Sequence, residues 1–314
     1  MKKVILLIGP TGVGKTSVSL LIARSLQTEI ISSDSMQIYR RMDIGTAKPS
    51  PEERGAIRHH MVDIVEPWEF YSTGEYVRKV ENIISGLHGK GKIPLVVGGT
   101  GLYIKAMTRG IFTGPSADRE LRNALLHEEE QTAGSLHERL RTLDPGAALR
   151  IEPADTRRII RALEVCIRSE RPMTELHEEL TRPLPYDFIK VGITRDRKEL
   201  YRMIDRRVDA MMEQGLLDEV REVVSLIRAK GPLQKLEDYP SLQAIGYKEI
   251  ARHLSGELSL DEAVALVKQR SRNYAKRQFT WFRKEEGIWW IDVTGLFDPS
   301  ALYKKMEGAL SVLA

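Results

Sequence analysis

The stretch VILLIGPTGVGKT, residues 4–16, decides the fold class of this chain. Its first half, residues 4–8, is continuously apolar, as strands of a parallel sheet are when helices cover both faces. Its second half matches G-x-x-x-x-G-K-T, a pattern whose glycines let backbone N–H groups close around phosphate oxygens. A helix is predicted to follow through Leu26, and its positive end would face the same phosphate. The sequence therefore predicts a phosphate-binding loop that consists of Gly9, Pro10, Thr11, Gly12, Val13, Gly14, Lys15 and Thr16.

Two side chains at the end of this loop add to the backbone groups. Lys15 brings a positive charge to the phosphate, and Thr16 offers a hydroxyl to Mg²⁺, which we expect as the cofactor. Thr16 is the metal ligand that the motif itself predicts.

Further apolar runs predict four more strands, at residues 29–33, 93–97, 188–193 and 288–293. Strands that alternate with helices form a parallel α/β sheet, whose ligands bind beyond the carboxyl ends of the strands. Between residues 114 and 185 the strand signal is absent and the pattern is helical. We therefore predict a P-loop-type parallel sheet with flanking helices and a helical insertion. The expected parts are a catalytic core (1–113), the insertion (114–185) and a continuation of the core with a basic helical region (186–314).

The composition is that of a globular protein with a core, with 314 residues of which 42% are hydrophobic and 29% charged. The apolar run at residues 4–8 is too short for a membrane span or a signal peptide, so we expect a cytoplasmic protein without a membrane partner. Cys166 is the single cysteine. It excludes an internal disulfide, fits a reducing compartment and is expected to be buried.

The basic residues are concentrated near the end of the chain. The net charge is +4, yet residues 268–284 contain seven basic side chains and no acidic one, and the remainder carries a net charge of −3. Residues 274–281 mix aromatic side chains with cations, which suits unpaired bases as well as phosphates. We expect Phe279 and Phe282 to be buried. A local patch of this kind is typical of a surface that binds a polyanion.

Asp34 is the best-placed acid for chemistry, because it follows the strand at residues 29–33 and lies on the same rim as the phosphate loop. Nucleotide triphosphatases usually have an apolar strand that ends in Asp, but residues 93–97 are followed by Gly98-Gly99-Thr100-Gly101. From its position, Asp34 is a general base, a magnesium ligand through water, or a helix cap. Gln37 could read the edge of a nucleobase, since its amide both donates and accepts. Thr100 could touch a substrate.

Seven stretches form a characteristic set of motifs: GPTGVGKT (9–16), DSMQIY (34–39), MDIGTAKP (42–49), GGTGLY (98–103), residues 155–164, AIGY (244–247) and KRQFTWFR (276–283). They run in one order over nearly the whole chain, and the blocks beyond the phosphate loop are highly specific. Together they resemble the bacterial tRNA dimethylallyltransferases.

This resemblance implies transfer of a dimethylallyl group from dimethylallyl diphosphate to the exocyclic amine of the adenosine 3′ to the anticodon, with release of diphosphate. The phosphate loop would hold the diphosphate, which Lys15, Arg207 and Mg²⁺ on Thr16 would stabilise. Asp34 would act as the general base on the amine, and the adenine would flip out of its stack. A monomer is expected. The matching positions that would contact tRNA are Asp34, Ser35, Met36, Gln37, Thr100, Arg122, Arg158, Arg161, Gly246, Lys276, Arg277 and Trp281.

The insertion contains a row of arginines that also suits RNA. Arg157, Arg161 and Arg168 fall on one face of a helix, and Arg150 joins them only if the helix continues through Pro153. Such a row is more often a solvated face than a binding site.

Three other functions remain open from the residues. A P-loop kinase would turn over ATP and would have no role for the basic segment. A dimethylallyl transferase that acts on free adenine nucleotides would need neither the insertion nor the basic segment. An RNA-binding nucleotide switch would bind RNA without chemistry.

Overall fold

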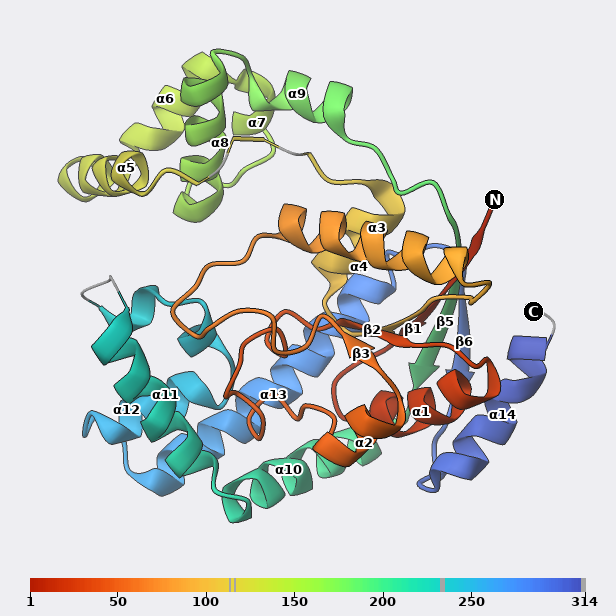
Figure 1. Ribbon diagram of the computed structural model, residues 1–314. Helices are drawn as coiled ribbons and strands as arrows, with labels where there is room; N and C mark the ends of the chain where they lie inside the picture. The colour runs from red at the N-terminus through yellow and green to blue at the C-terminus, as the bar shows by residue number, and fades with distance from the viewer. Residues whose placement is uncertain (113, 116, 232–234, 312–314) are drawn as a thin grey trace. The chain divides into compact units, whose positions relative to one another are not determined.

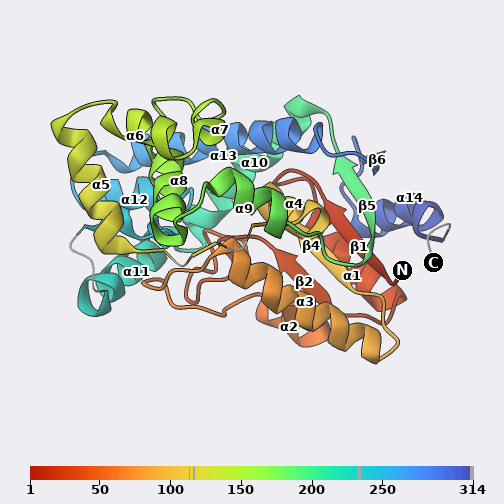
Figure 2. The ribbon, with the colours of Figure 1, turned by 90° about the horizontal axis from the view of Figure 1, so that it is seen from above.

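A six-stranded sheet forms the centre of the larger of two compact units. The computed structural model describes residues 1–314 apart from 113, 116, 232–234 and 312–314. One unit comprises Met1–Ile104 and Pro185–Ala314, and the other comprises Lys105–Leu184. The sheet has the order β3-β2-β4-β1-β5-β6, and every pairing is parallel (Figure 2). The strands are β1 (Lys3–Ile8), β2 (Ile30–Ser33), β3 (His59–His60), β4 (Leu95–Gly98), β5 (Asp187–Thr194) and β6 (Ile288–Asp292).

The register of the central strands brings three loops to one edge of the sheet. Gly98 at the end of β4 pairs with Ile8 at the end of β1 and with Ser33 at the end of β2. The segments that follow these three strands therefore leave the sheet side by side. They are the phosphate loop, the segment that starts at Asp34, and the glycine-rich turn after β4.

Helices pack on the sheet through a continuous apolar core. This core joins Leu7 of β1, Ile22 of α1, Ile204 of α10 and Met306 of α14, and α14 lies beside α1 (Figure 1). Strands enclosed in this way need apolar side chains on both faces, which explains the uninterrupted run that begins the chain. The helices of the larger unit are α1 (Lys15–Ser25), α2 (Pro51–Ala56), α3 (Thr73–Gly89), α10 (Arg197–Glu213), α11 (Leu216–Lys230), α12 (Tyr247–Leu254), α13 (Leu260–Phe282) and α14 (Pro299–Ser311), and α4 (Gly101–Arg109) crosses the division between the units.

A second core in the same unit supports the chain that follows β2. Ile38, Tyr39 and Met42 are buried against residues of α11 and α12, among them Val220 and Tyr247. Residues 36–47 contain no regular helix or strand, so these apolar anchors give the segment a defined position.

The smaller unit is helical and has a core of its own, formed by residues such as Leu125, Leu140 and Leu163. An antiparallel bridge between Ile111 and Arg182 joins its two ends. Its helices are α5 (Arg119–Gln131), α6 (Ser135–Leu143), α7 (Pro145–Ala148), α8 (Thr156–Ser169) and α9 (Met173–Leu180).

The predicted fold class is confirmed, with small differences at the ends of elements. The two-residue strand β3 escapes prediction because such a short segment has no measurable alternation. Cys166 and Phe282 are buried as expected, whereas Phe279 is only partly buried. Arg150 lies outside α8, which begins after Pro153, and its guanidinium donates instead to the carbonyl of Gly146.

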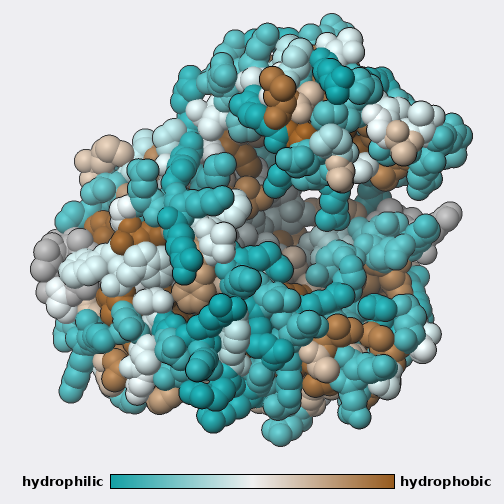
Figure 3. Space-filling view, turned by 180° about the vertical axis from the view of Figure 1, so that it is seen from behind, coloured by the Kyte–Doolittle hydropathy of each residue, from teal (hydrophilic) through white to brown (hydrophobic). Residues whose placement is uncertain are grey.

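One face of the protein shows mostly polar side chains. Hydrophilic residues cover most of the face in Figure 3, and the apolar patches between them are scattered. Within the described part of the chain, no helix has both the length and the apolar character that a bilayer span requires.

Candidate active site

The phosphate loop has the backbone conformation that its glycines predict. Gly12 and Gly14 adopt φ angles of +80° and +105°, a region that other residues rarely enter. Gly14 is also the residue before α1, which leaves the first N–H groups of the helix directed toward the loop. A phosphate in this loop would meet both the backbone donors and the positive end of α1.

Lys15 folds back over the loop that precedes it. Its Nζ donates to the carbonyl oxygens of Gly9, at 2.9 Å, and Pro10, at 2.7 Å. Burial lowers the pKa of Lys15 to about 7; Asp34 opposes this shift and Arg207 adds to it. An anion bound in the loop would favour the charged ammonium and raise this pKa again.

Arg207 reaches the same loop from α10. Its Nη1 donates to the Thr11 hydroxyl at 3.3 Å, and it lines the cavity that Lys15 lines. Burial lowers the pKa of Arg207, while Asp34 opposes the shift. The two cations thus share one desolvated site, and the Asp34 carboxylate opposes the pKa shift of both, an arrangement that favours a further anion.

The Asp34 side chain is held by backbone amides of the residues that follow it. Its Oδ1 accepts hydrogen bonds from the amides of Met36, at 2.8 Å, and Gln37, at 3.4 Å. Among the described residues, both of its hydrogen bonds end on Oδ1, so Oδ2 is available to the cavity. No helix begins after Asp34 in this segment of the described chain, so Asp34 is not the helix cap that the sequence left open. Its carboxylate closes a turn instead, which orients it and is compatible with a chemical role.

Two cavities meet at Asp34. The first, of about 320 Å³, is lined by the phosphate loop with Lys15 and Thr16. The second, of about 270 Å³, is lined by Ser35, Met36 and Gly246 with an apolar wall from α10 and α13. Five residues line both cavities: Thr11, Asp34, Thr46, Arg207 and Tyr274. The site can therefore hold a phosphate compound on one side of Asp34 and an organic group on the other.

The oxygen donors near the loop suit Mg²⁺. Thr16 and Asp34 line the first cavity together, and hydroxyl and carboxylate oxygens are ligands that hard cations prefer. Among the described residues, no cluster of three or more His, Cys, Asp or Glu side chains could hold a metal unaided. Magnesium usually keeps several waters and binds through one or two carboxylates plus phosphate oxygens, so this donor set fits it alongside a bound diphosphate.

Glu219, which belongs to none of the sequence motifs, fixes residues 43–45 of a loop that lines both cavities. The Glu219 carboxylate accepts from the amides of Asp43, Ile44 and Gly45 at 2.8–3.0 Å, and from the Tyr247 hydroxyl at 2.5 Å. These contacts join residues that are far apart in the chain, so no local sequence pattern predicts them.

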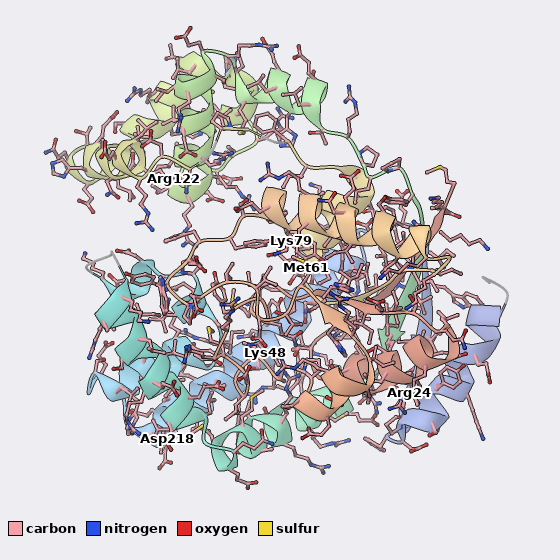
Figure 4. All side chains as sticks on the ribbon, in the orientation of Figure 1. Arg24, Lys48, Met61, Lys79, Arg122 and Asp218 are labelled. Carbon is pink, nitrogen blue, oxygen red and sulfur yellow. The ribbon has the colours of Figure 1, made fainter. Side chains whose placement is uncertain are left out.

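The neighbouring part of this loop is held by two other side chains. The Gln37 amide donates to the carbonyls of Thr46 and Ala47 and accepts from the Ser32 hydroxyl, so its hydrogen-bonding groups already serve the fold. Its reading of a nucleobase remains a prediction. Lys48, labelled in Figure 4, has a side chain only 1% exposed and forms ion pairs with Asp43 and Asp63.

The glycine-rich turn after β4 lies against Asp34 and α13. The Thr100 hydroxyl accepts from the amide of Ser35 at 3.1 Å, which joins this turn to the segment after β2. Trp281 is 40% exposed and covers Gly101, where an added Cβ would lie 2.4 Å from the indole. The structure thus brings the predicted site residues Ser35, Thr100 and Trp281 to the same edge of the sheet.

Helix α13 carries the basic segment, but acids of neighbouring helices neutralise part of it. The helix begins with a capping box in which Ser259 and Glu262 bond each other's backbone. Three basic residues near its middle pair with acids: Lys268 with Asp209, Arg270 with Glu249 and Arg272 with Asp205. Lys276 and Arg277 are exposed, and Arg277 lies 5.7 Å from the ring centre of Tyr274. The cationic surface is therefore smaller than the segment suggests.

The three arginines of the smaller unit that were predicted to contact tRNA lie on α5 and α8. Arg122 (labelled in Figure 4) and Arg161 both bind the fully buried carboxylate of Glu164, at 2.7 and 2.5 Å. Burial raises the pKa of Glu164, but hydrogen bonds from Arg122, the Asp118 amide and Arg161 bring it below its usual value. Arg158 is exposed and forms an ion pair with Asp155 at 3.3 Å. Arg122 and Arg161 therefore have a structural role, whatever contact they make with RNA.

Family models and known sequences match this chain over most of its length. A model described as IPP transferase matches residues 37–285, and one described as isopentenyl transferase matches residues 2–64. The tRNA dimethylallyltransferase of Thermodesulfovibrio yellowstonii is 54% identical, over 99% of this chain and 98% of its own. That of Bacillus subtilis is 44% identical, over 93% of this chain and 91% of its own.

Solved structures agree with these matches. A tRNA isopentenylpyrophosphate transferase from Bacillus halodurans has a TM-score of 0.70 at 38% identity, covering 99% of this chain and 97% of that one. A eukaryotic dimethylallyltransferase described as acting on tRNA has a TM-score of 0.85 at 29% identity, covering 100% of this chain and 80% of that one. The matches in sequence and in fold place this chain in the tRNA dimethylallyltransferase family.

Proposed function

We propose that this protein transfers a dimethylallyl group from dimethylallyl diphosphate to the exocyclic amine of the adenosine 3′ to the anticodon of tRNA. The observation that carries the proposal is the meeting of two cavities at Asp34, one lined by the phosphate loop and the other by Met36 and Gly246. A diphosphate on one side and a base on the other would bring the allylic carbon and the amine together beside this carboxylate.

The first cavity suits departure of the diphosphate. The bond between the allylic carbon and the diphosphate oxygen breaks, and negative charge grows on the leaving oxygens. Lys15, Arg207 and the loop amides would stabilise that charge in a desolvated site, where such interactions are strong. Mg²⁺, held by Thr16 and the diphosphate, would supply further charge stabilisation when bound.

Asp34 is suited to the acceptor. The amine of adenine is a poor nucleophile, because its lone pair is delocalised into the ring. The Asp34 carboxylate would accept a hydrogen bond and then a proton from this amine as the carbon–nitrogen bond forms. The turn fixes Oδ1, and Asp34 already lines both cavities, so little reorganisation is needed at the moment of transfer.

The second cavity and its surroundings suit RNA. An adenine inside a stack cannot reach Asp34, so the base would flip into the cavity that Ser35, Met36 and Gly246 line. Lys276, Arg277 and Trp281 offer cations and an aromatic ring for the flanking nucleotides. We include in this proposal that Arg122, Arg158 and Arg161 contact the tRNA. We also include that the protein is a monomer and that it acts in the cytoplasm, where tRNA is found.

The deciding experiment supplies the purified protein with Mg²⁺, radiolabelled dimethylallyl diphosphate and unmodified tRNA, with free AMP in a parallel reaction. We expect label in tRNA, at the adenosine next to the anticodon, and none in AMP. Label in AMP alone would identify a transferase of free nucleotides. A third reaction contains ATP in place of dimethylallyl diphosphate. ATP turnover there, without label in either acceptor of the first two reactions, would favour the kinase alternative and would remove Asp34 from its assigned role.

A further inference from the structure

Gln278 of α13 connects two of the three loops at the carboxyl edge of the sheet. Its Oε1 accepts from the Thr11 amide at 2.8 Å, and its Nε2 donates to the Gly99 carbonyl at 2.9 Å. Gln278 is only 6% exposed and lines the first cavity. Both ends of a buried amide are therefore used to hold backbone groups of the active site, from positions 267 and 179 residues away in the chain.

The fit between Gln278 and the turn after β4 is so close that a larger residue at position 99 would displace the Gln278 amide. An added Cβ at Gly99 would lie 2.2 Å from Nε2 of Gln278, with Gly9 O at 3.2 Å. One turn of helix to either side, Tyr274 reaches the cavities beside Asp34 and Trp281 covers Gly101. These three residues form one face of α13 and contact the site at successive points, while Lys276 and Arg277 are exposed to solvent.

We propose that Gln278 is a positioning residue for transfer: its amide fixes the spacing between the phosphate loop and the Gly98–Gly101 turn, so that the donor diphosphate and the carboxylate of Asp34 keep their alignment. This inference rests on the proposed function. Gln278 acts on the reactants indirectly, by two routes. One route is Thr11, whose hydroxyl accepts a hydrogen bond from Arg207. The other is the Gly98–Gly101 turn, whose Thr100 hydroxyl accepts a hydrogen bond from the Ser35 amide.

The first test compares Gln278→Met with Thr28→Val. Gln278→Met keeps the side-chain length and removes both hydrogen bonds. Thr28→Val also removes a buried side-chain bond to a backbone carbonyl, that of Ile93, but at the opposite end of the sheet. We expect Gln278→Met to lower kcat/KM for the donor on the order of 10²-fold, the cost of small misalignment, with tRNA affinity unchanged. Thr28→Val should change neither.

A second pair of variants moves the amide without removing it. Gly99→Ala should displace Gln278 and lower kcat/KM for the donor in the same way. Gly86→Ala is its control, because an added Cβ at Gly86 meets no atom within 4 Å.

Gln278→Glu tests the role of the amide through the pH dependence of kcat/KM, which a loss of folded protein alone would not change. The protonated carboxyl copies the amide, with one O–H donor and one acceptor, whereas the carboxylate would repel both Gly99 O and the diphosphate. Burial raises the pKa of such a carboxyl. The ratio of Gln278→Glu to wild-type kcat/KM for the donor should therefore rise as pH falls, and dividing by the wild type removes the pH dependence that the two proteins share.

Hydrogen exchange separates this inference from the proposed function. In Gln278→Met the amides of residues 9–14 and 98–101 should exchange faster than in Thr28→Val, whether or not the wild type transfers dimethylallyl groups. Unchanged exchange in these loops, or kcat/KM values for Gln278→Met equal to those of Thr28→Val, would overturn the positioning role. A wild-type protein without transfer activity would overturn the proposed function alone.

Discussion

At the scale of single residues, Asp34 offers the sharpest test, because its two oxygens have different tasks. Oδ1 holds the turn to Met36 and Gln37, whereas Oδ2 accepts no hydrogen bond from the described residues, and Asp34 lines both cavities. Asp34→Asn keeps an oxygen for the turn but cannot accept a proton. Transfer should fall by about 10²–10⁴-fold, the usual contribution of a general base, in single-turnover assays with saturating donor.

The tRNA affinity of Asp34→Asn should stay within a few fold of the wild type, measured by filter binding. Asp34→Ala, which also loses the turn, should abolish transfer as well. Near-normal turnover in Asp34→Asn would show that the carboxylate only holds the turn and takes no proton.

Lys15 leads to a prediction about pH. Its pKa of about 7 in the unliganded site lies below that of a free lysine, so the ammonium loses its proton as pH rises through 7. A bound diphosphate favours the ammonium, and binding above pH 7 must therefore take up a proton. Affinity for a non-reactive thiolodiphosphate analogue of the donor should fall by up to about tenfold per pH unit above 7. Titration calorimetry in buffers of different ionisation enthalpy measures the proton directly.

Lys15→Arg is the control for this effect, since arginine stays charged throughout the range. Its affinity for the analogue should change with pH only as much as the ligand's own ionisation requires. An equally steep loss in Lys15→Arg would assign the pH dependence to the ligand rather than to Lys15.

At the scale of elements, the sequence predicts those helices, strands and loops whose formation depends on residues close together in the chain. The apolar run of β1 and the glycines of the phosphate loop carry local signals, and the positions of the other long strands follow from similar runs. The edge at which Asp34 and Thr100 meet also follows, because parallel strands end on one side.

Contacts between distant elements carry no such signal. The bonds of Glu219 to residues 43–45 and of Gln278 to Thr11 depend on tertiary packing. Arg272 illustrates the same limit, since it belongs to the basic segment in sequence but pairs with Asp205 of α10 in the structure. Local charge counts therefore overestimate the cationic surface of α13.

The difference between the number of basic residues in α13 and the number that remain free to bind phosphate can be measured. The double variant Lys276→Ala, Arg277→Ala should weaken tRNA binding and reduce the dependence of log K on log salt concentration by about one unit for each phosphate that the protein no longer neutralises. Binding isotherms between low and physiological salt give this slope.

The matched control removes a charge pair instead. Arg272→Gln with Asp205→Asn leaves the net charge unchanged and should leave the salt slope near the wild-type value. A slope that falls as much in this control as in the Lys276 and Arg277 variant would move the RNA-binding surface toward the middle of the helix.

At the scale of the whole molecule, the two compact units have separate cores, and Glu164 is the point at which the smaller one is vulnerable. Its buried carboxylate joins α8 to Arg122 of α5 and to the Asp118 amide. Glu164→Ala removes hydrogen bonds to a charged group, which typically contribute about 1.5–3 kcal/mol. Arg122 and Arg161 are each more than a third exposed, so water can solvate them once the carboxylate is gone and the cost stays within this range. Glu164→Ala should lower the free energy of unfolding of residues 105–184 by about that amount.

The loss should be confined to the smaller unit. Hydrogen exchange should accelerate in α5 and α8 of Glu164→Ala, while the sheet of the larger unit keeps its protection and its affinity for the donor analogue. In the wild type, the folded-state pKa of Glu164 lies below the unfolded value, so its stabilising contribution is present at neutral pH and is lost as pH falls through the folded-state pKa. The exchange difference between wild type and Glu164→Ala should accordingly shrink under acid conditions. Acceleration spread equally over β1, β4 and β5 would instead show that the two units unfold as one, and the arginines around Glu164 would then stabilise the catalytic core as well.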